Sequence, residues 1–384
     1  MAEAAPAPKL RIACIVGTRP EAIKMAPVIL TLRRQPWANV VVVATAQHRG
    51  MLDQVLDLFE IVPDVDLDLM RTGQGLVDLT ARLTTSLDAA FGRIAPDVVL
   101  AQGDTTTVMV AALVAFYRRI RFGHVEAGLR THDLDNPFPE EMNRKVAGIL
   151  ARWHFAPTES SRRNLLAEGT PDAAIHVTGN TVIDALLDVA GRPEVDGGGA
   201  TGERLVLVTS HRRENFGAPL ESICRAVRRL ADANADCRFL YPVHPNPNVR
   251  DVAERMLGRH PRIDLVAPLD YAAFVAVMRR ATLILTDSGG VQEEAPALGK
   301  PVLVLREETE RPEAVDAGVV QLVGHDEARI VDTAQRLLDD PAAYAAMAKG
   351  VSPYGDGHAA GRIAAVLEAH AREVVGFAAP TRTE

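Results

Sequence analysis

The sequence predicts an α/β fold built from two Rossmann-like, doubly wound domains. Short apolar segments alternate with amphipathic stretches along the whole chain, and this alternation is typical of a parallel sheet with helices on both faces. The apolar segments are continuous rather than interrupted by polar residues, as expected of strands that are buried on both faces. A chain of 384 residues is also long enough for two domains.

The predicted elements follow one another in the same alternation through both halves. Strands are predicted over Leu10–Val16, Val40–Ala44, Val98–Ala101, Phe122–Val125, Leu205–Thr209, Phe239–Val243, Leu283–Thr286 and Val302–Leu305. Amphipathic helices are predicted over Leu76–Phe91 and Pro219–Ala231. Further helices are expected over Thr106–Tyr117 and from about Pro139 onward.

A glycine-rich segment separates the two halves. Residues 192–203 read RPEVDGGGATGE, and three consecutive glycines do not belong inside a helix or strand. We expect an N-terminal domain over residues 10–180 and a C-terminal domain over residues 181–357. A last helix near residues 358–375 is expected to pack back on the first domain. Residues 1–9 are expected to be a disordered tail rather than a signal peptide, because no basic segment precedes an apolar one there.

The composition excludes several classes of protein. The net charge of −8 argues against a nucleic-acid partner. The chain has no apolar run long enough to span a membrane, so no membrane partner is expected. The three cysteines, Cys14, Cys224 and Cys237, form neither a disulfide framework nor a metal site. Cys14 and Cys237 lie in apolar runs and are expected in the core. Together these observations indicate a cytoplasmic globular protein without a metal.

The first strand–helix junction, Gly17 to Lys24, has the features of an anion site. Gly17 allows a ligand to approach the backbone, and Arg19 and Lys24 supply cations at the carboxyl edge of the sheet. The alternative is an ordinary turn with a solvated arginine. The pattern G-x-G-x-x-G is absent, which argues against a nicotinamide dehydrogenase.

Acidic residues follow predicted strands of the first half. Asp104 ends AQGD and Glu126 ends GHVE, and Glu140 lies in a helix start further along. Acids at the ends of parallel strands are expected to face one crevice. An alternative for Asp104 is that it caps the following helix. Glu140 is also spaced to pair with Arg144, four residues on.

The second half contains a predicted diphosphate site. The segment Thr286 to Glu294 reads TDSGGVQEE, and a strand, a Ser-Gly-Gly turn and a helix start present backbone N–H groups to an anion. Arg311 is a further cation, and His211, at another strand end, is a candidate for anion binding and proton transfer. One glutamate of the pair Glu293 and Glu294 is expected to turn toward sugar hydroxyls. The alternative is an ordinary turn with solvated glutamates.

These residues lie in a series of motifs that occur in a fixed order. The chain resembles the non-hydrolysing UDP-N-acetylglucosamine 2-epimerases of bacteria from Leu10 to its last helix. Pro20-Glu21 after Gly-Thr-Arg favours the non-hydrolysing branch over its hydrolysing relatives. The motifs are GTRPEAIKMAP, TAQHRGMLDQ, GDTTT, HVEAGLRT, FPEEMNR, TGNTVIDAL, HRREN, YPVHPNPNVR, LTDSGGVQEEAP, GKPVLVLREETERPEAV and PYGDG.

The resemblance implies a GT-B-like arrangement, in which two Rossmann-like domains face a cleft that holds the UDP-sugar. It implies interconversion of UDP-GlcNAc and UDP-ManNAc by elimination of UDP and re-addition, with no cofactor, in a homodimer. The residues that correspond to the reaction centre are Arg19, Lys24, Asp104, Glu126, Glu140 and His211. Those that correspond to UDP binding are Arg19, Lys24, His211, Phe274, Ser288, Gly289, Gly290, Glu294 and Arg311.

Some members of this family are activated by UDP-GlcNAc at a second site. Gln47, His48, Arg212 and His244 match residues associated with that site. Gly50 and Gly73, however, stand where some regulated members carry polar or basic side chains, which argues against activation here. Leu269 replaces a glutamine that lies beside the uracil in some members.

Three alternatives remain open at this level. A glycosyltransferase of the same fold would bind a UDP-sugar but would also need an acceptor. A UDP-sugar sensor would keep the Ser-Gly-Gly turn without needing the acids, and the presence of Asp104, Glu126, Glu140 and His211 argues against it. A related 2-epimerase of a modified UDP-aminouronate would use the same residues.

Overall fold

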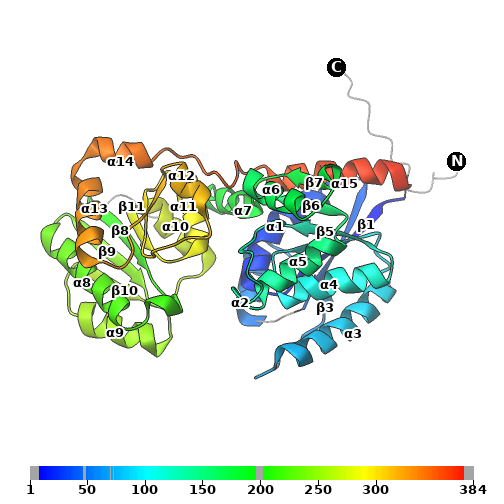
Figure 1. Ribbon diagram of the computed structural model, residues 1–384, viewed down its shortest axis with the longest axis horizontal. Coiled ribbons are helices and arrows are strands. Elements are labelled where there is room, and N and C mark those ends of the chain that lie inside the picture. Colours follow the sequence, from blue (N-terminus) through cyan, green and yellow to red (C-terminus); the bar gives the residue numbers. More distant parts are fainter. Residues whose placement is uncertain (1–7, 46–48, 70, 72, 196–201, 376–384) are drawn as a thin grey trace, which may run out of the picture. The chain divides into compact units, whose positions relative to one another are not determined.

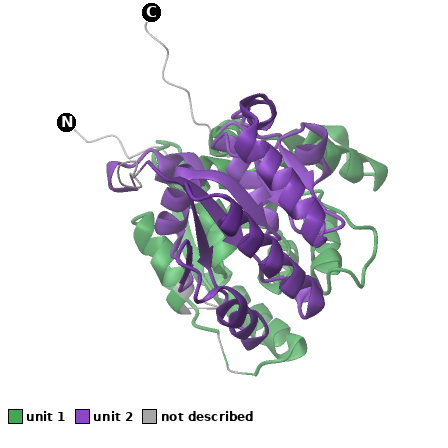
Figure 2. Cartoon of the chain, turned by 90° about the vertical axis from the view of Figure 1, so that its left-hand side faces the viewer, with its two compact units in different colours: residues 1–185, 357–384 green, residues 186–356 purple. Residues whose placement is uncertain are grey.

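The computed structural model describes residues 8–45, 49–69, 71, 73–195 and 202–375, which fold as two compact α/β units (Figure 1). Unit 1 comprises Met1–Ala185 and Gly357–Glu384, and unit 2 comprises Leu186–Asp356 (Figure 2). Each unit contains one parallel sheet with helices between successive strands. The predicted fold class is therefore confirmed.

The sheet of unit 1 has the strand order β3-β2-β1-β4-β5-β6-β7, and its recorded strand pairs are parallel. β1 and β4 are buried at nearly every position, as the continuous apolar runs predict. The strands are β1 (Leu10–Val16), β2 (Ala38–Ala44), β3 (Val65–Asp66), β4 (Val98–Gln102), β5 (Arg121–Val125), β6 (Trp153–Ala156) and β7 (Ile175–Val177).

Two groups of helices pack in unit 1. One group joins α1, α2 and α15, so the last helix of the chain lies against the first, and the other joins α3, α4 and α5 (Figure 1). Helix α7 contains the boundary between the units. The helices are α1 (Arg19–Arg33), α2 (Arg49–Leu58), α3 (Leu76–Ile94), α4 (Thr106–Tyr117), α5 (Glu140–Leu150), α6 (Glu159–Ala167), α7 (Thr181–Ala190) and α15 (Ala359–Val375), with a 3₁₀ turn at Asp172–Ala174.

The sheet of unit 2 has the order β10-β9-β8-β11-β12-β13. Its strands are β8 (Arg204–Thr209), β9 (Cys237–Pro242), β10 (Ile263–Val266), β11 (Ala281–Thr286), β12 (Val302–Val304) and β13 (Val320–Leu322). Its helices are α8 (Ala218–Ala233), α9 (Pro247–Leu257), α10 (Tyr271–Arg280), α11 (Gly289–Ala297), α12 (Pro312–Asp316), α13 (Glu327–Asp339) and α14 (Pro341–Met347), with 3₁₀ turns at Pro193–Val195 and Arg213–Asn215.

The core of each unit is made by strand residues and the apolar faces of the helices that follow them. In unit 2, β8, β9 and β11 pack against α8 and α13 through one continuous cluster of buried side chains. Helix α8 is amphipathic and buries the leucines, isoleucine, valine and alanines of one face. All three cysteines are buried, as predicted for Cys14 and Cys237.

Two buried imidazoles are neighbours in the sheet of unit 1. His124 on β5 and His154 on β6 are register partners, and both are almost fully buried. Burial lowers the pKa of each ring from 6.5 to about 4. Both rings are therefore neutral at pH 7, because an ionised imidazole would be poorly solvated in these buried positions.

Acidification should lower the free energy of unfolding, because the unfolded chain protonates these two histidines more readily than the folded chain. The variant His154→Gln should lose less stability on acidification than the wild type. Above pH 6.5, folded and unfolded chains both hold a neutral His154. Below 6.5 the unfolded chain binds a proton there, and the folded chain does not until about pH 4. The free energy of unfolding should therefore fall by roughly 1 kcal/mol per pH unit in this window. Urea midpoints at pH 7 and pH 5 measure the difference, and equal losses in both proteins would contradict the prediction.

Candidate active site

The turn between β1 and α1 is held by a buried glutamate. One carboxylate oxygen of Glu21 accepts hydrogen bonds from the backbone N–H groups of Gly17, at 2.8 Å, and Thr18, at 2.7 Å. This contact closes the turn and orients the start of α1. The first turns of that helix carry Arg19 and Lys24, both half-buried, at the carboxyl edge of the sheet.

Glu126, directly after β5, is surrounded by hydrogen-bond donors. Its Oε1 lies 2.5 Å from Nζ of Lys24 and 2.8 Å from Nδ2 of Asn180, and its Oε2 accepts from the amide of Gln102. The residue adopts a left-handed backbone conformation with φ of 64°, which is uncommon outside glycine and often found at functional sites. As the sequence predicts, no helix follows it directly; α5 begins at Glu140.

Asp104, directly after Gly103 at the end of β4, lies in the same group of charges. Its carboxylate contacts NH2 of Arg144 at 2.5 Å. Burial raises the pKa of Asp104, and the negative charge of Glu126 adds to the shift, whereas Arg144 and Lys24 oppose it. The structure thus brings Asp104, Glu126 and Lys24 together, as the strand-end argument predicts.

The alternative interpretation of Asp104 as a helix cap is wrong. The N-cap of α4 is Thr105, whose hydroxyl accepts a hydrogen bond from the backbone N–H of Val108 and donates one to Glu21 at 2.5 Å. Because the neighbouring threonine caps the helix, the carboxylate of Asp104 is not used as a cap and instead pairs with Arg144.

The pairing of Glu140 with Arg144 is also wrong. Glu140 and Glu141 begin α5, as predicted. Arg144, however, contacts Glu141 at 3.2 Å and Asp104 rather than the residue four positions before it. Glu141 is fully buried and Glu140 only half-buried. The arginine therefore neutralises one carboxylate that is shielded from water, that of Glu141, and one that is partly exposed, that of Asp104.

In unit 2 the Ser-Gly-Gly turn begins α11, and Ser288 is its N-cap. The backbone N–H of Ser288 donates to Oγ1 of Thr286 at 3.0 Å. A Cβ atom at Gly289 would lie 2.6 Å from NH1 of Arg311, so a larger residue here would displace the guanidinium. The guanidinium of Arg311 thus lies directly against the Ser-Gly-Gly turn. Gly289 and Gly290 of this turn are the first two residues of α11.

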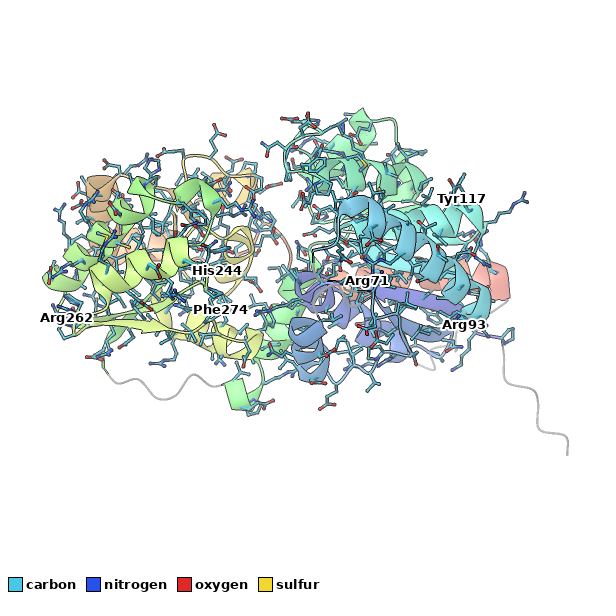
Figure 3. All side chains as sticks on the ribbon, turned by 90° about the horizontal axis from the view of Figure 1, so that it is seen from below. Arg71, Arg93, Tyr117, His244, Arg262 and Phe274 are labelled. Carbon is cyan, nitrogen blue, oxygen red and sulfur yellow. The ribbon has the colours of Figure 1, made fainter. Side chains whose placement is uncertain are left out.

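The glutamates that follow lie beyond the first turn of α11, which contains no acidic residue. Neither glutamate therefore lies where it would repel a phosphate at the helix start, and the expectation that one of them turns toward sugar hydroxyls stays a prediction. Glu293 forms an ion pair with Arg311 at 2.6 Å, and Glu294 accepts a hydrogen bond from the hydroxyl of Tyr271 at 2.7 Å. Phe274 is half-buried on α10, the helix that begins at Tyr271 (Figure 3).

His211 follows β8 in the same unit. Its Nδ1 lies 3.3 Å from Oδ1 of Asp287, and its ring stacks on that of His244 with centroids 5.8 Å apart and planes 16° from parallel. Burial lowers the pKa of His211, and the charge of Asp287 opposes this shift. A largely neutral imidazole at pH 7 follows, and such a ring can accept or return a proton.

Arg212 belongs to a second group of charges beside the turn. It lies 3.4 Å from Glu310, which also contacts Arg311 at 2.6 Å and Arg306 at 2.8 Å. Burial alone would raise the pKa of Glu310, but Arg311 and Arg306 hold it at about 2. The segment that carries Arg311 is therefore fixed by ion pairs on both sides.

The residues that the resemblance links to a second UDP-GlcNAc site are only partly described. Arg212 and His244 lie in unit 2 with the contacts given above. Gln47 and His48 fall outside the described residues. Among the described positions, Gly50 and Gly73 have no neighbouring atoms within 4 Å of an added Cβ, so larger side chains there would have room.

Sequence reasoning did not assign roles to several residues that hold this site together. They lie inside the quoted motifs, but their importance depends on partners far away in sequence. Gln102 and Asn180 donate to Glu126, Arg144 pairs with Asp104, and Asp287 contacts His211. An aspartate directly before Ser-Gly-Gly was a usable signal for Asp287. The others carried no local signal.

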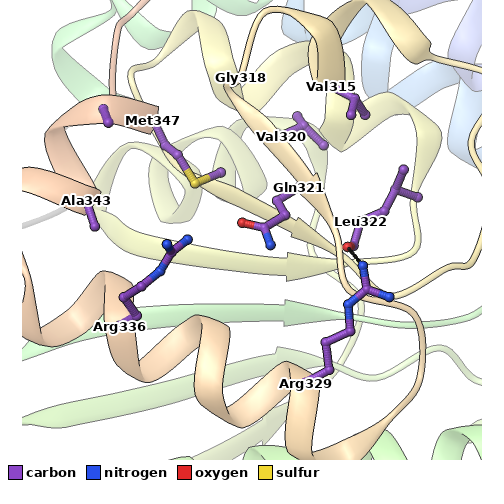
Figure 4. A pocket seen from close by; sticks show the side chains of 10 residues that line it. Val315, Gly318, Val320, Gln321, Leu322, Arg329, Arg336, Ala343 and Met347 are labelled. Carbon is purple, nitrogen blue, oxygen red and sulfur yellow. Dashed lines mark hydrogen bonds between the residues drawn. The ribbon is translucent and has the colours of Figure 1, made fainter.

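A pocket of about 520 Å³ lies elsewhere in unit 2, between β13, α13 and α14 (Figure 4). It is lined by apolar side chains and by Arg329 and Arg336, and Arg329 donates to the carbonyl of Leu322 at 2.9 Å. None of the residues predicted for the site lines it.

Across the described residues, no His, Cys, Asp and Glu side chains are grouped to hold a metal. No helix in that same part of the chain is long and apolar enough to cross a membrane.

The fold and these charged groups place the protein in a class of α/β enzymes whose structures have two Rossmann-like units. The structure of the glycosyltransferase of kitacinnamycin shares this fold with a TM-score of 0.67 at 13% identity. The family described as UDP-N-acetylglucosamine 2-epimerase matches residues 30–368. The chain therefore belongs to the UDP-N-acetylglucosamine 2-epimerase family and is an epimerase.

Individual relatives are similar over nearly their whole length. The UDP-N-acetylglucosamine 2-epimerase of Escherichia coli K12 is 51% identical over 374 residues, covering 94% of this chain and 98% of the relative. That of Bacillus subtilis is 49% identical over 366 residues, covering 94% and 96%. The structure of the enzyme from Neisseria meningitidis bound to UDP-GlcNAc has a TM-score of 0.85 at 44% identity, covering 94% of this chain and 100% of that one.

Replacing Asp104 by asparagine should separate its chemistry from its part in folding. The melting temperature should be equal or higher, because burial raises the pKa of Asp104 and a neutral side chain avoids the cost of burying a charge. Turnover should fall by roughly 100-fold or more if the carboxylate transfers a proton. Thr105→Ala is the control: it removes the actual cap and should cost about 1 kcal/mol of stability. Unchanged turnover in Asp104→Asn would contradict a catalytic role.

Removing Arg311 should weaken nucleotide binding. Arg311→Ala should lower the affinity for UDP by roughly 1.5–3 kcal/mol, the usual range for a hydrogen bond to a charged group. Arg306→Ala removes another arginine of the same ionic group without touching Gly289, and it should change the affinity far less. Calorimetric titration with UDP measures both variants. An unchanged dissociation constant in folded Arg311→Ala would exclude Arg311 from the site.

Proposed function

We propose that the enzyme interconverts UDP-GlcNAc and UDP-N-acetylmannosamine (UDP-ManNAc) without a redox cofactor. The observation that carries the proposal is the grouping of Asp104, Glu126 and Lys24 at one sheet edge of unit 1. Two carboxylates beside an ammonium suit proton transfer at a sugar carbon. Membership of the family supports the reaction, and the relative from Neisseria meningitidis, described as bound to UDP-GlcNAc, supports the substrate.

The chemistry of C2 favours elimination over direct deprotonation. The C2–H bond of UDP-GlcNAc is not next to a carbonyl, so its proton is weakly acidic. When the C1–O bond breaks with its electron pair going to UDP, the C2–H pair forms the C1=C2 bond of 2-acetamidoglucal and the proton passes to a side chain. A second side chain then protonates C2 on the other face, and UDP re-adds at C1. Atoms and charges balance without an oxidant.

The residues of unit 2 suit the departing UDP. The turn of Ser288, Gly289 and Gly290 offers backbone N–H groups, and Arg311 lies against it. Donors and cations that are already in place stabilise the charge that develops on a leaving diphosphate. Phe274 is proposed to contact the uracil, and Glu294 the ribose.

The proton transfers are assigned to four groups. Asp104, Glu126, Glu140 and His211 are proposed to supply the acids and bases on the two faces of the sugar. The raised pKa of Asp104 favours its protonated form near neutral pH relative to an exposed aspartate, as a proton donor needs. Arg19 and Lys24 are proposed to contact the substrate phosphates or the reacting sugar.

The alternative functions differ from the proposed one in what each would do with UDP-GlcNAc. A glycosyltransferase converts UDP-GlcNAc only when an acceptor is present, and a UDP-sugar sensor does not convert it at all. A 2-epimerase of a modified UDP-aminouronate would leave UDP-GlcNAc unchanged and act on the oxidised sugar. Incubation with UDP-GlcNAc alone therefore distinguishes all three from the proposed reaction.

We also propose a homodimer. Phe116 and Tyr117 at the end of α4 and Ile149 on the neighbouring α5 are strongly exposed apolar side chains. Covering them with a second copy would remove apolar surface from water. Light scattering that gives the mass of a single chain at micromolar concentration would contradict this proposal.

Elimination predicts exchange of the C2 proton with solvent. The purified protein, without added cofactor, should convert UDP-GlcNAc in D₂O to a mixture with UDP-ManNAc that carries deuterium at C2, as seen by NMR. A little UDP and 2-acetamidoglucal should escape, because the intermediate is not covalently bound.

Two results would contradict this mechanism. Product whose C2 stays fully protonated in D₂O would mean that the proton does not exchange with solvent. A strict requirement for added NAD would indicate oxidation elsewhere on the sugar instead of elimination.

A further inference from the structure

The loop after β8 is organised by one buried carboxylate, that of Asp287 at the end of β11. Its Oδ2 accepts hydrogen bonds from the hydroxyl of Ser210 at 2.9 Å and from the side-chain amide of Asn215 at 2.9 Å. The same oxygen accepts from the backbone N–H groups of His211, at 2.8 Å, and Arg212, at 2.9 Å. Asp287 itself is completely buried.

Within the described part of the chain, the other oxygen of this carboxylate, Oδ1, lacks the hydrogen-bond donors that surround Oδ2. Oδ1 of Asp287 is buried and accepts no hydrogen bond of standard geometry from the described residues. It lies 3.3 Å from Nδ1 of the His211 ring. A buried carboxylate oxygen without a donor is costly. The Nδ1 atom of His211 is within ion-pair distance of it but not in hydrogen-bond geometry, and a rotation of the ring would bring an N–H group at Nδ1 onto this oxygen.

The plane of the His211 ring is held from a second side. His244, which follows β9, stacks on it almost in parallel. The Nδ1 atom of His244 accepts a hydrogen bond from the backbone N–H of Asn246 at 3.2 Å, which fixes the orientation of the stacking ring. In addition, the hydroxyl of Tyr241 donates to the carbonyl of Ser210 at 2.9 Å and anchors the residue before His211.

We propose that Asp287 is a positioning residue that holds His211 in the tautomer protonated at Nδ1, so that Nε2 carries the free electron pair. The part of this proposal that concerns catalysis rests on the proposed function, in which Nε2 exchanges a proton with the substrate or with UDP. The tautomer itself does not depend on that function. An aspartate behind a histidine fixes the tautomer and orientation of catalytic imidazoles in the same way in unrelated enzymes.

The charged and titratable groups that act on His211 come from three segments. Asp287, directly after β11, favours the protonated ring, whereas Arg212 on the loop of His211 and His244 after β9 disfavour it, together with burial. Asp287→Asn removes the only one of these influences that favours the imidazolium, so the pKa of His211 should fall further in that variant. The substitution also places an amide N–H₂ group beside the ring. Because this group donates where the carboxylate accepts, it should favour the tautomer protonated at Nε2.

The direct test is the tautomer of His211 in the full-length enzyme. Protein labelled with ¹⁵N only in histidine is studied by long-range ¹H–¹⁵N correlation at pH 8, and His211→Gln identifies the signals. The wild-type ring should be protonated at Nδ1, and the ring in Asp287→Asn at Nε2. A wild-type ring protonated at Nε2 would overturn the proposal, whether or not any variant folds and whatever reaction the enzyme catalyses.

Kinetics test the consequence for turnover. Asp287→Asn should lower kcat by roughly 100-fold or more with a small change in KM, and the acidic limb of its pH profile should move to lower pH. Ser210→Ala is the matched control, because it removes a donor to Oδ2 but leaves Oδ1 facing the ring. It should lower the melting temperature while keeping the wild-type tautomer and pH profile. A pH profile of Asp287→Asn that matches the wild type would mean that Asp287 only supports the fold.

Discussion

Buried carboxylates that accept hydrogen bonds from two consecutive backbone N–H groups hold the loops on which this structure depends. A loop at the carboxyl edge of a parallel sheet leaves such N–H groups without partners in the ladder, and an ionised carboxylate satisfies two of them at once. The same device recurs in both units. The acceptors and their donors are Glu21 with Gly17 and Thr18, Glu141 with Thr131 and His132, Asp184 with Ala359 and Ala360, and Asp287 with His211 and Arg212.

This device has an electrostatic cost that the surrounding donors offset only in part. Burial raises the pKa of Glu21 and of Asp184 even though backbone N–H groups oppose the shift. Removing the donors of such a group would leave a buried charge without compensation, which is far more destabilising than the loss of an exposed ion pair. These loops are therefore held in one conformation, because any conformation that separates the carboxylate from its donors is strongly destabilised. Rigid loops suit a reaction in which a proton must leave one face of a sugar carbon and return on the other.

The two units contribute different chemistry. Unit 1 gathers acids, with Asp104 and Glu126 sharing the field of Lys24 and Arg144. Unit 2 presents a helix start with Arg311 lying against its first glycine. The first set suits proton transfer and the second suits binding of a diphosphate. A nucleotide-sugar that loses and regains UDP needs both sets, and this division is the physical basis of the proposed reaction.

The sequence by itself determined the fold class and the places where function would gather. Strands buried on both faces must be continuously apolar, so β1, β4, β8 and β11 could be predicted. With them came the sheet edge of unit 1 that carries Asp104 and Glu126 and the sheet edge of unit 2 that carries the Ser-Gly-Gly turn. The short strands β3, β10 and β13 carried too little pattern to predict, although β12, which is as short as β13, was predicted from its apolar run. Only the tertiary structure decided the partners of each charge: Arg144 pairs with Asp104 rather than Glu140, Thr105 caps α4, and Asp287 faces His211. The two ion pairs depend on which strands and helices lie side by side, and strand order in a parallel sheet does not follow the order of the chain. The cap depends on the backbone geometry at the start of α4, where Asp104 and Thr105 are both suitable by residue type.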